Sequence, residues 1–406
     1  MGADTDIAIV GGGPVGAALA LALRDSELHL TVLEARATQS AGSDPRPIAL
    51  SHGSRLLLER LGAWADVGTN AAATPINHIH VSQRGGFGRV AISAAEADVP
   101  HLGYVFDYND LFLKLAGAAQ RAACDYRDGA RVTALTRDGN VSRLDYARDG
   151  AAAVLTARLV VVADGGDIAG LAPPKILDYA QHALTARVRT TLPHKNVAYE
   201  RFTPDGPLAL LPFCARGEQG DRGNQGNEMA LVWTLTPARA EALKDADEKT
   251  FLDALRVAFG ARLGDFTAVT QRACYPLTLR YSTSTDAPGV ITIGNAAQTL
   301  HPVAGQGFNL GLRDAWELAQ ILCRLSPQAL TNPETIHETT AALRGYVSSR
   351  RIDRGATIAA THGLVRLFSN DFFPASVARG AGMTALGCIA PLKNILARRM
   401  IFGARG

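Results

Sequence analysis

Short hydrophobic runs alternate with glycine turns and amphipathic stretches along the chain, a pattern typical of mixed α/β proteins. Near the start, Ile7 to Val10 predicts a strand, and the Ala- and Leu-rich residues 17–23 predict a helix. A second strand is predicted from Leu28 to Leu33. The apolar runs 159–163 and 290–293 have the composition of further strands of the same sheet. We therefore expect an α/β domain whose strands come from distant parts of the chain.

A different pattern occurs between these runs. Residues 76–92 and 180–235 contain alternating or short apolar segments, which predict a sheet covered on one face. We expect three parts: a discontinuous, Rossmann-like nucleotide-binding domain (1–75, 101–175 and 272–330), an inserted substrate-domain sheet (76–100 and 176–271), and a helical, basic C-terminal segment (331–406).

A glycine-rich turn joins the first predicted strand to the first predicted helix. Gly11, Gly13 and Gly16, with Pro14 and Val15 between them, match the spacing of the dinucleotide-binding fingerprint. The first glycine permits the sharp turn, the second lets backbone amides approach a pyrophosphate, and the third brings helix and strand together. The helix N-terminus then faces the phosphates with unpaired amides and the positive end of its dipole.

An acidic residue ends the second predicted strand. Glu34 lies about twenty residues after the glycines, where a carboxylate accepts hydrogen bonds from a ribose and disfavours a 2′-phosphate. A GxGxxG match alone is weak, but strand, helix and terminal acid together favour a binding site over a structural turn. We expect Glu34 to bind the adenosine ribose of a dinucleotide.

A second glycine-rich segment follows the strand predicted at 290–293 and leads into a helix that begins near Gly307. This segment has glycine at 294, 305, 307 and 311, and because ordering glycine costs more conformational entropy than ordering other residues, so many are not expected in an ordinary turn. In a chain that already has an adenosine site, a second set of amides at a helix N-terminus suits the ribityl phosphate and isoalloxazine of a flavin. The residues expected in this second cradle are Gly294, Asn295, Gly305, Gln306, Gly307, Phe308 and Asn309.

These motifs resemble those of a known family. The glycine turn, Glu34, the central Ala163-Asp164-Gly165 and the segment from Gly294 to Asp314 are similar to class A flavoprotein aromatic hydroxylases. Four further segments, at 46–51, 60–64, 81–88 and 368–371, resemble the sequences of the ubiquinone-biosynthesis branch, and within it those of the 2-polyprenyl-6-methoxyphenol hydroxylases. The resemblance covers nearly the whole chain.

The resemblance implies a glutathione-reductase-type FAD-binding domain and a monooxygenase that uses NAD(P)H and O2 to hydroxylate a polyprenylated methoxyphenol. In this family the reduced flavin adds oxygen to form a C4a-hydroperoxide, which the phenol ring attacks. The resemblance also implies that Ala35, Arg46, Asp164 and Gly165 belong to the flavin site, and that Pro302 and Gly305 border the substrate pocket. His301 lies inside the flavin motif, but a lone histidine beside a proline is more often structural, so the sequence assigns no catalytic base.

Two positions depart from the wider family. Asp164-Gly165 is not followed by the Ser and Arg associated with holding FAD and nicotinamide together, and Asn295 replaces an acid, a change usual in the ubiquinone branch. Three hypotheses follow. The leading one is a ubiquinone-pathway hydroxylase; the others are a hydroxylase of a soluble aromatic acid and a flavin-bearing scaffold of a membrane-associated biosynthetic complex.

Composition adds bounds on size and setting. The 406 residues, 47% of them hydrophobic and 19% charged, suffice for a sizeable core and about two domains. The five cysteines are scattered without a CxxC or Cys/His cluster, which argues against a metal and fits a reduced, cytoplasmic setting. The acidic N-terminus matches neither a signal peptide nor a myristoylation motif.

Positive charge is concentrated near the C-terminus. Residues 344–406 hold ten basic and two acidic side chains, a net charge of +8, although the whole chain has only +3. Because aromatic and aliphatic residues are interleaved with them, this segment predicts contact with an anionic membrane face or a partner protein. Arginine-rich helices packed on the body, with their charges solvated, are the alternative. No apolar run is long enough to span a bilayer, and no recognised nucleic-acid module accompanies the basic residues.

Overall fold

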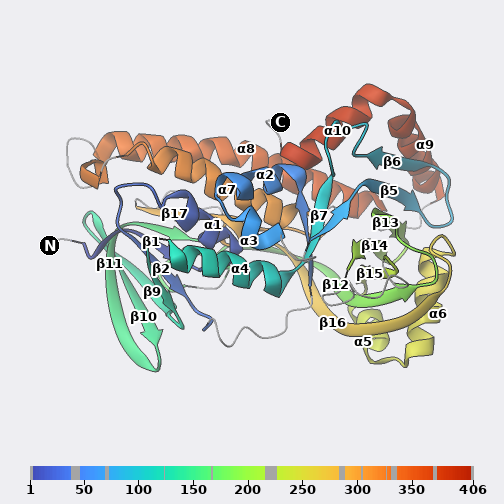
Figure 1. The fold of residues 1–406 in the computed structure, drawn as a ribbon, viewed down its shortest axis with the longest axis horizontal. Coiled ribbons are helices and arrows are strands. Elements are labelled where there is room, and N and C mark those ends of the chain that lie inside the picture. Colours follow the sequence, from blue (N-terminus) through green and yellow to red (C-terminus); the bar gives the residue numbers. More distant parts are fainter. Residues whose placement is uncertain are drawn as a thin grey trace.

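The computed structural model describes residues 3–37, 46–68, 73–122, 124–165, 168–214, 226–282, 289–302, 305–325, 327–330, 336–368 and 373–403. Within these ranges the strands form three sheets, and the last three helices run along one side of the molecule (Figure 1).

The first sheet has seven strands in the order β8-β2-β1-β11-β10-β9, with β17 paired to β11. Strand β1 pairs in parallel with β2 and β11, and β11 pairs in parallel with β17, which confirms the predicted assembly of distant apolar runs. Strands β9 and β10 extend β11 as an antiparallel ribbon at the lower left of Figure 1. The strands are β1 (Thr5–Val10), β2 (Leu30–Glu34), β8 (Asp125–Asp128), β9 (Arg131–Asp138), β10 (Val141–Arg148), β11 (Ala151–Val162) and β17 (Val290–Thr292).

Three helices, α1 (Pro14–Ala22), α4 (Tyr108–Arg121) and α7 (Gln306–Leu322), bury apolar side chains in one core with this sheet. Every residue of β1 is buried, as expected for a central parallel strand covered on both faces. Helix α1 is also apolar on nearly all sides because it packs between α4 and α7 as well as on the sheet. In this packing Val15, in the first turn of α1, lies against Gly311 of α7.

The second sheet has eight strands in the order β18-β16-β12-β15-β14-β13-β5-β6. Helices α5 (Pro237–Asp245) and α6 (Glu248–Phe259) cover one face around the buried Trp233, and the other face borders a cavity. The domain boundary expected at residue 271 falls inside β16. The strands are β5 (His78–Gln83), β6 (Arg89–Ser93), β12 (Lys175–Thr190), β13 (Val197–Thr203), β14 (Gly206–Phe213), β15 (Glu228–Leu235), β16 (Phe266–Tyr281) and β18 (Gln298–Thr299).

A small third sheet and two further helices complete this part of the fold, and both helices contribute side chains to the core of the first sheet. The strands of the third sheet are β3 (Pro47–Ser51), β7 (Gly103–Asp107) and β4 (Thr74–Ile76), in the order β3-β7-β4. Helix α2 (His52–Arg60) follows β3 directly and is capped by Ser51, whose side chain accepts a hydrogen bond from the Ser54 amide. Helix α3 (Trp64–Gly68) comes next in the chain.

The C-terminal part is helical, as predicted. It consists of α8 (Ile336–Phe368), α9 (Phe373–Cys388) and α10 (Ala390–Phe402). Figure 1 shows α8 running along the half of the molecule that contains the seven-stranded sheet, whereas α9 and α10 lie at the other end, near β5 and β6. No helix in the part of the chain that the structure describes combines the length and apolar character needed to cross a membrane.

Candidate functional site

The three glycine-containing motifs meet at one place in the fold. Val15, at the start of α1, lies so close to Gly294 that a Cβ on that glycine would be 3.1 Å from a Val15 methyl. A Cβ on Gly165 would be 3.3 Å from the Cβ of Asn295, and one on Gly11 would be 2.7 Å from the Asp164 amide. The structure therefore brings together the early, central and late motifs that the sequence separates by more than a hundred residues.

The first glycine turn has the geometry of an anion cradle. Gly13 is the N-cap of α1, has no side-chain cap, and a Cβ added to it would meet nothing within 4 Å. Pro14 follows at the first helical position, where its missing N–H costs nothing. Gly16, in contrast, is in tight contact with Gly11, since a Cβ there would be 1.8 Å from the Gly11 carbonyl oxygen. The open amides of α1 thus fit a pyrophosphate.

Glu34 ends β2 beside this cradle and is buried. Its carboxylate accepts hydrogen bonds from the Gly12 amide (2.7 Å) and from the Arg36 amide (2.9 Å), which follows Ala35. Each oxygen of a carboxylate has a second lone pair, so a ribose hydroxyl remains a suitable donor. The position agrees with the predicted ribose role, which stays a prediction.

Glu34→Ala is expected to weaken FAD binding by about ten- to a hundredfold, the loss of hydrogen bonds to a charged acceptor. FAD content after purification and the dissociation constant of the reconstituted enzyme measure this effect. Glu34→Gln, which keeps an acceptor oxygen, is the matched control and should lose less. Wild-type FAD content in Glu34→Ala would contradict the ribose role.

The second glycine segment forms a similar helix N-terminus. Gly305 is the N-cap of α7 in the left-handed conformation (φ 58°), which favours glycine. A Cβ on Gly307 would meet nothing within 4 Å, so this turn leaves space in front of the helix. The neighbouring Gln306 side chain points to α10, where its amide lies 3.5 Å from the Met400 carbonyl. The open N-terminus fits the negative charge of a flavin phosphate or ring edge.

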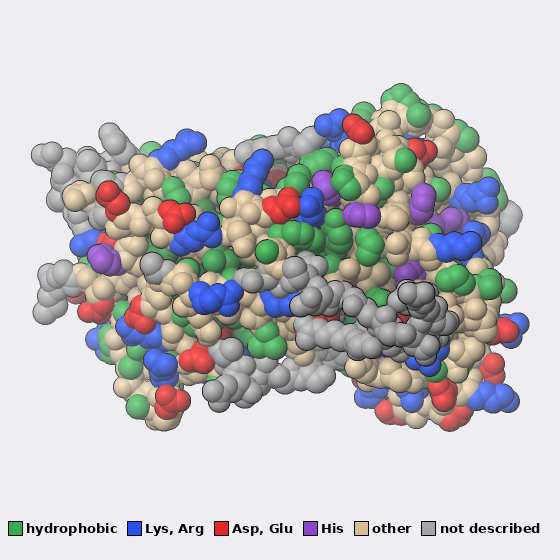
Figure 2. Space-filling model, viewed as in Figure 1, with side chains coloured by type: hydrophobic (Ala, Val, Ile, Leu, Met, Phe, Trp, Pro, Cys, Tyr) green, Lys and Arg blue, Asp and Glu red, His purple; other side chains and the backbone are tan. Residues whose placement is uncertain are grey.

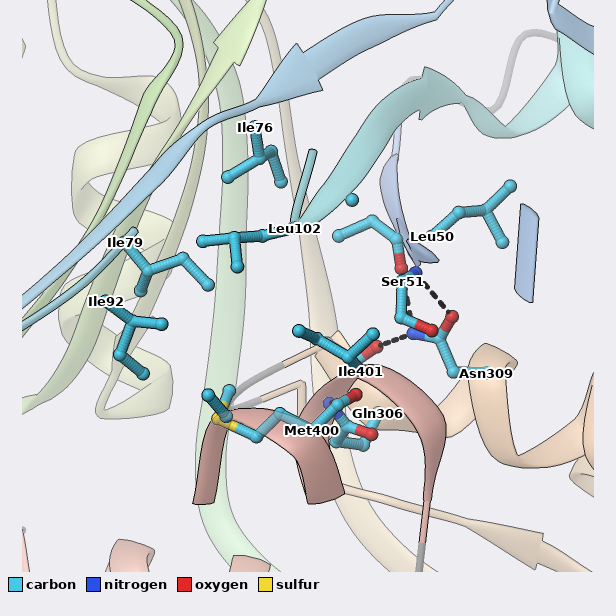
Figure 3. Close-up of a pocket in the computed structure, with 14 residues that line it drawn as sticks. Leu50, Ser51, Ile76, Ile79, Ile92, Leu102, Gln306, Asn309, Met400 and Ile401 are labelled. Carbon is cyan, nitrogen blue, oxygen red and sulfur yellow. Dashed lines mark hydrogen bonds between the residues drawn. The ribbon is translucent and has the colours of Figure 1, made fainter. Parts of the chain in front are cut away.

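Asn309 lies in the first turn of α7, as expected, and its side chain is hydrogen-bonded within the protein. Its side-chain oxygen accepts from the Ser51 amide (2.8 Å) and the Ser54 hydroxyl (2.7 Å), and its nitrogen donates to the carbonyls of Ala49 (3.0 Å) and Gly305 (2.8 Å). Figure 3 shows it beside Ser51. The amide therefore ties the α7 turn to β3, and its capacity for a flavin contact is used by the protein itself.

A buried ion cluster supports the late motif. The carboxylate of Asp314 accepts from the Gly294 amide (3.1 Å), Gln298 Nε2 (3.1 Å), Arg350 Nε (2.7 Å) and Arg354 Nη2 (3.3 Å). Both arginines are buried and come from α8. Arg350 and Arg354 of the basic C-terminal segment are therefore neither exposed to solvent nor available to contact a membrane. Sequence reasoning missed this role, although Tyr346, Arg350 and Arg354 are spaced by four residues on one helix face.

A cavity of about 730 Å³ extends from the flavin motifs to the C-terminal helices. Its volume is typical of a site for a small organic ligand. Of the predicted site residues, Arg46, Asn295, His301, Pro302, Gly305, Gly307 and Phe308 line it. The remaining walls are mainly apolar side chains of the eight-stranded sheet, α9 and α10.

A smaller adjoining pocket of about 70 Å³ shares part of this lining. In Figure 3, Met400 and Ile401 of α10 approach from one side and Ile76, Ile79 and Ile92 from the other. Helix α10 therefore closes the apolar side of the site, a contribution that no sequence motif signalled.

Two polar members of the lining have defined surroundings. The Arg46 guanidinium lies 5.1 Å from the ring centroids of both Tyr108 and Tyr275, so it is held between two aromatic rings. His301 is buried and packs edge-on against Tyr179, with 5.3 Å between ring centroids. Burial lowers the pKa of His301 to about 4, so its imidazole is neutral at physiological pH. This packing agrees with the structural role expected for it.

These features together fit FAD. The open N-terminus of α1, the acid at the end of β2 and the contact between Gly165 and Asn295 lie at the carboxyl ends of the parallel strands β1, β2, β11 and β17, and the open N-terminus of α7 lines the large cavity. The described residues contain no group of three or more His, Cys, Asp or Glu side chains suited to a metal ion.

Comparison with known proteins agrees with this geometry. Residues 4–332 match the family model described as an FAD binding domain. The chain is 34% identical to the ubiquinone hydroxylase UbiL of Rhodospirillum rubrum, over 97% of this chain and 88% of that protein. It is 30% identical to the 3-demethoxyubiquinol 3-hydroxylase of Escherichia coli, over 96% of each. Its fold is similar to that of p-nitrophenol 4-monooxygenase PnpA from Pseudomonas putida, with a TM-score of 0.74 at 17% identity over 100% of both chains.

Proposed function

Because the chain belongs to the FAD-binding-domain family, and within it to the ubiquinone hydroxylases, we propose that its substrate is a polyprenylated methoxyphenol whose aromatic ring it hydroxylates. The protein is an FAD-dependent monooxygenase of ubiquinone biosynthesis that uses NAD(P)H and O2. This activity favours the leading hypothesis over the scaffold.

The observation that carries the substrate proposal is the composition of the large cavity. It begins at Pro302 and Gly305 of the flavin motif, and its walls continue through apolar side chains to Leu386 and Leu396 of the C-terminal helices. A prenyl chain gains about 0.8 kcal/mol for each methylene group buried in such a site. A small aromatic acid makes no use of most of this surface, so the cavity supports a substrate with a hydrocarbon tail.

The chain's own groups perform the binding and positioning steps. Bound FAD supplies the activation of O2 and the transfer of one oxygen atom. The N-terminal amides of α1 would hold the pyrophosphate, and those of α7 would stabilise negative charge on the flavin ring or its phosphate. The apolar walls exclude water from the reacting atoms and orient the phenol ring against the flavin. Residues such as Asn309 and Asp314 act indirectly, since they fix the loops that present these amides.

A substrate series tests the proposal. The FAD-loaded enzyme is supplied with NADPH and 2-geranyl-6-methoxyphenol, the same phenol without its prenyl chain, or 4-hydroxybenzoate. We expect hydroxylated product per NADPH consumed to be highest with the prenylated phenol. Efficient coupling with the soluble acid and none with the prenylated phenol would support the second hypothesis instead.

We propose further that the enzyme meets this substrate at an anionic membrane surface through α9 and α10. Hydrophobic side chains are visible over these helices at the upper right of Figure 2. Leu392 and Ile395 are 47% and 54% exposed, while Leu396 of the same helix lines the cavity. The exposed Arg398 and Arg399 add positive charge beside them. An apolar helix surface with flanking cations, continuous with the cavity, suits a lipid interface.

Replacing both Leu392 and Ile395 by Gln is expected to reduce binding to phosphatidylglycerol-containing vesicles by about tenfold or more, because two exposed apolar side chains are lost. Vesicle flotation measures the bound fraction. Val257→Gln on α6 is the control, since Val257 is 63% exposed but does not line the cavity. Equal binding of the double variant and the wild type would contradict the membrane proposal.

A further inference from the structure

One carboxylate lies in the apolar wall of the large cavity. Glu200 of β13 pairs in register with Val81 of β5 and with Ala209 of β14. The same row continues through Val232 of β15 to Thr185 of β12, and all five residues line the cavity. Since alternate residues of a strand face opposite sides, Glu200 points with its row into the cavity, away from α5 and α6.

This carboxylate has no compensating group. Among the described residues, none forms a hydrogen bond or ion pair with the Glu200 side chain, and no other acidic residue lines the cavity. Glu200 is half-buried, and removing an ionisable group from bulk water without a partner costs free energy, so such groups are uncommon unless they act on a ligand. Burial raises the pKa of Glu200 to about 7, which places its ionisation near physiological pH.

We propose that Glu200 is the group that accepts the hydrogen bond, and then the proton, of the substrate's phenolic hydroxyl. This inference rests on the proposed function, since it requires a phenol in the cavity. It supplies the catalytic base that no sequence motif identified. It also separates the substrate hypotheses, because a carboxylate in an apolar wall disfavours a second, anionic carboxylate beside it.

The step is a proton transfer without redox change. The phenolic O–H bond breaks and an O–H bond forms on the Glu200 carboxylate. The bonding electron pair stays on the phenolic oxygen and delocalises into the ring, which makes the ortho and para carbons more nucleophilic towards the transferred oxygen. After product release, Glu200 returns the proton to water. A base whose pKa lies near the working pH is well suited to this transfer.

The other ionisable groups near Glu200 do not account for a titration near neutral pH. Arg46, before β3, and Arg379 of α9 line the cavity and stay positively charged, and His301 is neutral because its pKa is about 4. Tyr275 of β16 also lines the cavity, and its ring contacts the Arg46 guanidinium. On β5, the ring of His80 lies against Tyr199, and β14 contains no ionisable side chain.

Ligand binding to the oxidised, FAD-loaded enzyme tests the proposal without turnover. The probes are 2-geranyl-6-methoxyphenol and its methyl ether, in which the phenolic O–H becomes O–CH3. For the wild type we expect the phenol to bind more tightly at about pH 8 than at about pH 6, because an ionised acceptor makes the stronger hydrogen bond. The ether should show the opposite trend or none, because only protonated Glu200 donates to it. At about pH 8 the affinity for the phenol should exceed that for its methyl ether by about ten- to a hundredfold.

In Glu200→Gln the pH dependence should disappear, because an amide does not ionise, and the preference for the phenol should shrink, because the amide oxygen is a neutral acceptor. Glu200→Asp should retain part of both. Glu241→Gln, which changes an exposed glutamate on α5, should bind as the wild type does. A Glu200→Gln enzyme that keeps the wild-type preference and pH trend would overturn the assignment of Glu200 while leaving the proposed function intact. A wild type that binds neither probe would overturn both.

Loss of folding is not expected to complicate this experiment. The folded-state pKa of Glu200 lies above its ordinary value, so the native state binds more protons than the unfolded state, and stability falls as pH rises towards 7. Glu200→Gln removes that penalty and should be at least as stable as the wild type above about pH 7. A thermal melt of each variant checks this. In turnover, coupled hydroxylation by the wild type should rise as pH increases through 7, and this rise should be absent in Glu200→Gln.

Discussion

Asp314→Ala is expected to destabilise the protein by about 3–5 kcal/mol, the cost of breaking a buried ion pair by removing one partner. Asp314 is 0% exposed, and its carboxylate accepts from two buried arginines, a side-chain amide and the Gly294 amide. Without it, Arg350 keeps Glu317 and Asp353, but Arg354 loses its carboxylate partner. The same change removes the partner of Gly294, so FAD content should also fall.

Chemical denaturation of Asp314→Ala and the wild type measures this difference. Glu317→Ala is the control, because Glu317 also pairs with Arg350 but its side chain is 25% exposed, and such a pair contributes about 1 kcal/mol or less. A loss for Asp314→Ala no greater than that of the control would show that the cluster does not stabilise the late flavin motif.

Gly16→Ala is expected to abolish FAD retention and to destabilise the apoprotein. The added Cβ would lie 1.8 Å from the Gly11 carbonyl oxygen and 3.3 Å from a methyl of Ile9, so the turn must move. Overpacking of this kind typically costs about 1–3 kcal/mol. Because the turn presents the amides of α1, its displacement removes the phosphate cradle as well.

Gly13→Ala separates these two effects. A Cβ at Gly13 meets no protein atom within 4 Å, and its φ of −60° suits alanine, so the apoprotein should unfold as the wild type does. The methyl group would nevertheless occupy the space assigned to the pyrophosphate, and FAD affinity should drop by about tenfold or more. Unfolding of the apoproteins and FAD titration measure the two quantities. Full FAD affinity in Gly13→Ala would contradict the placement of the pyrophosphate there.

The parts of this fold that depend on local pattern were predictable. Continuous apolar runs predicted β1, β11 and β17. Glycine spacing predicted the N-termini of α1 and α7, because a tight backbone turn with little room for side chains requires glycine. The resemblance to class A flavoprotein hydroxylases predicted the family and its cofactor, FAD. These predictions agree with the parallel pairing and with the contact between Val15 and Gly294.

The parts that depend on tertiary contacts were not predictable in the same way. Arg350 reads as one of many basic residues, yet it is buried against Asp314, and only the packing of α8 on α7 brings the two together. Asn309 lies in a flavin motif, but its hydrogen bonds go to β3 and α2. Glu200 lies in a strand whose pattern does not reveal which face borders a cavity. The partners of Arg350 and Asn309 in β3, α2 and α7 and the cavity that Glu200 faces are formed by segments distant in sequence, so the local pattern does not encode them.

Incorporation of labelled dioxygen tests the central claim most directly. The FAD-loaded enzyme is incubated with NADPH, labelled dioxygen and 2-geranyl-6-methoxyphenol in detergent, and the products are analysed by mass spectrometry. We predict a product that carries one labelled oxygen atom on the aromatic ring. Reduction of the flavin with release of hydrogen peroxide alone, and no labelled product at any substrate concentration, would contradict hydroxylation of a prenylated phenol by this protein.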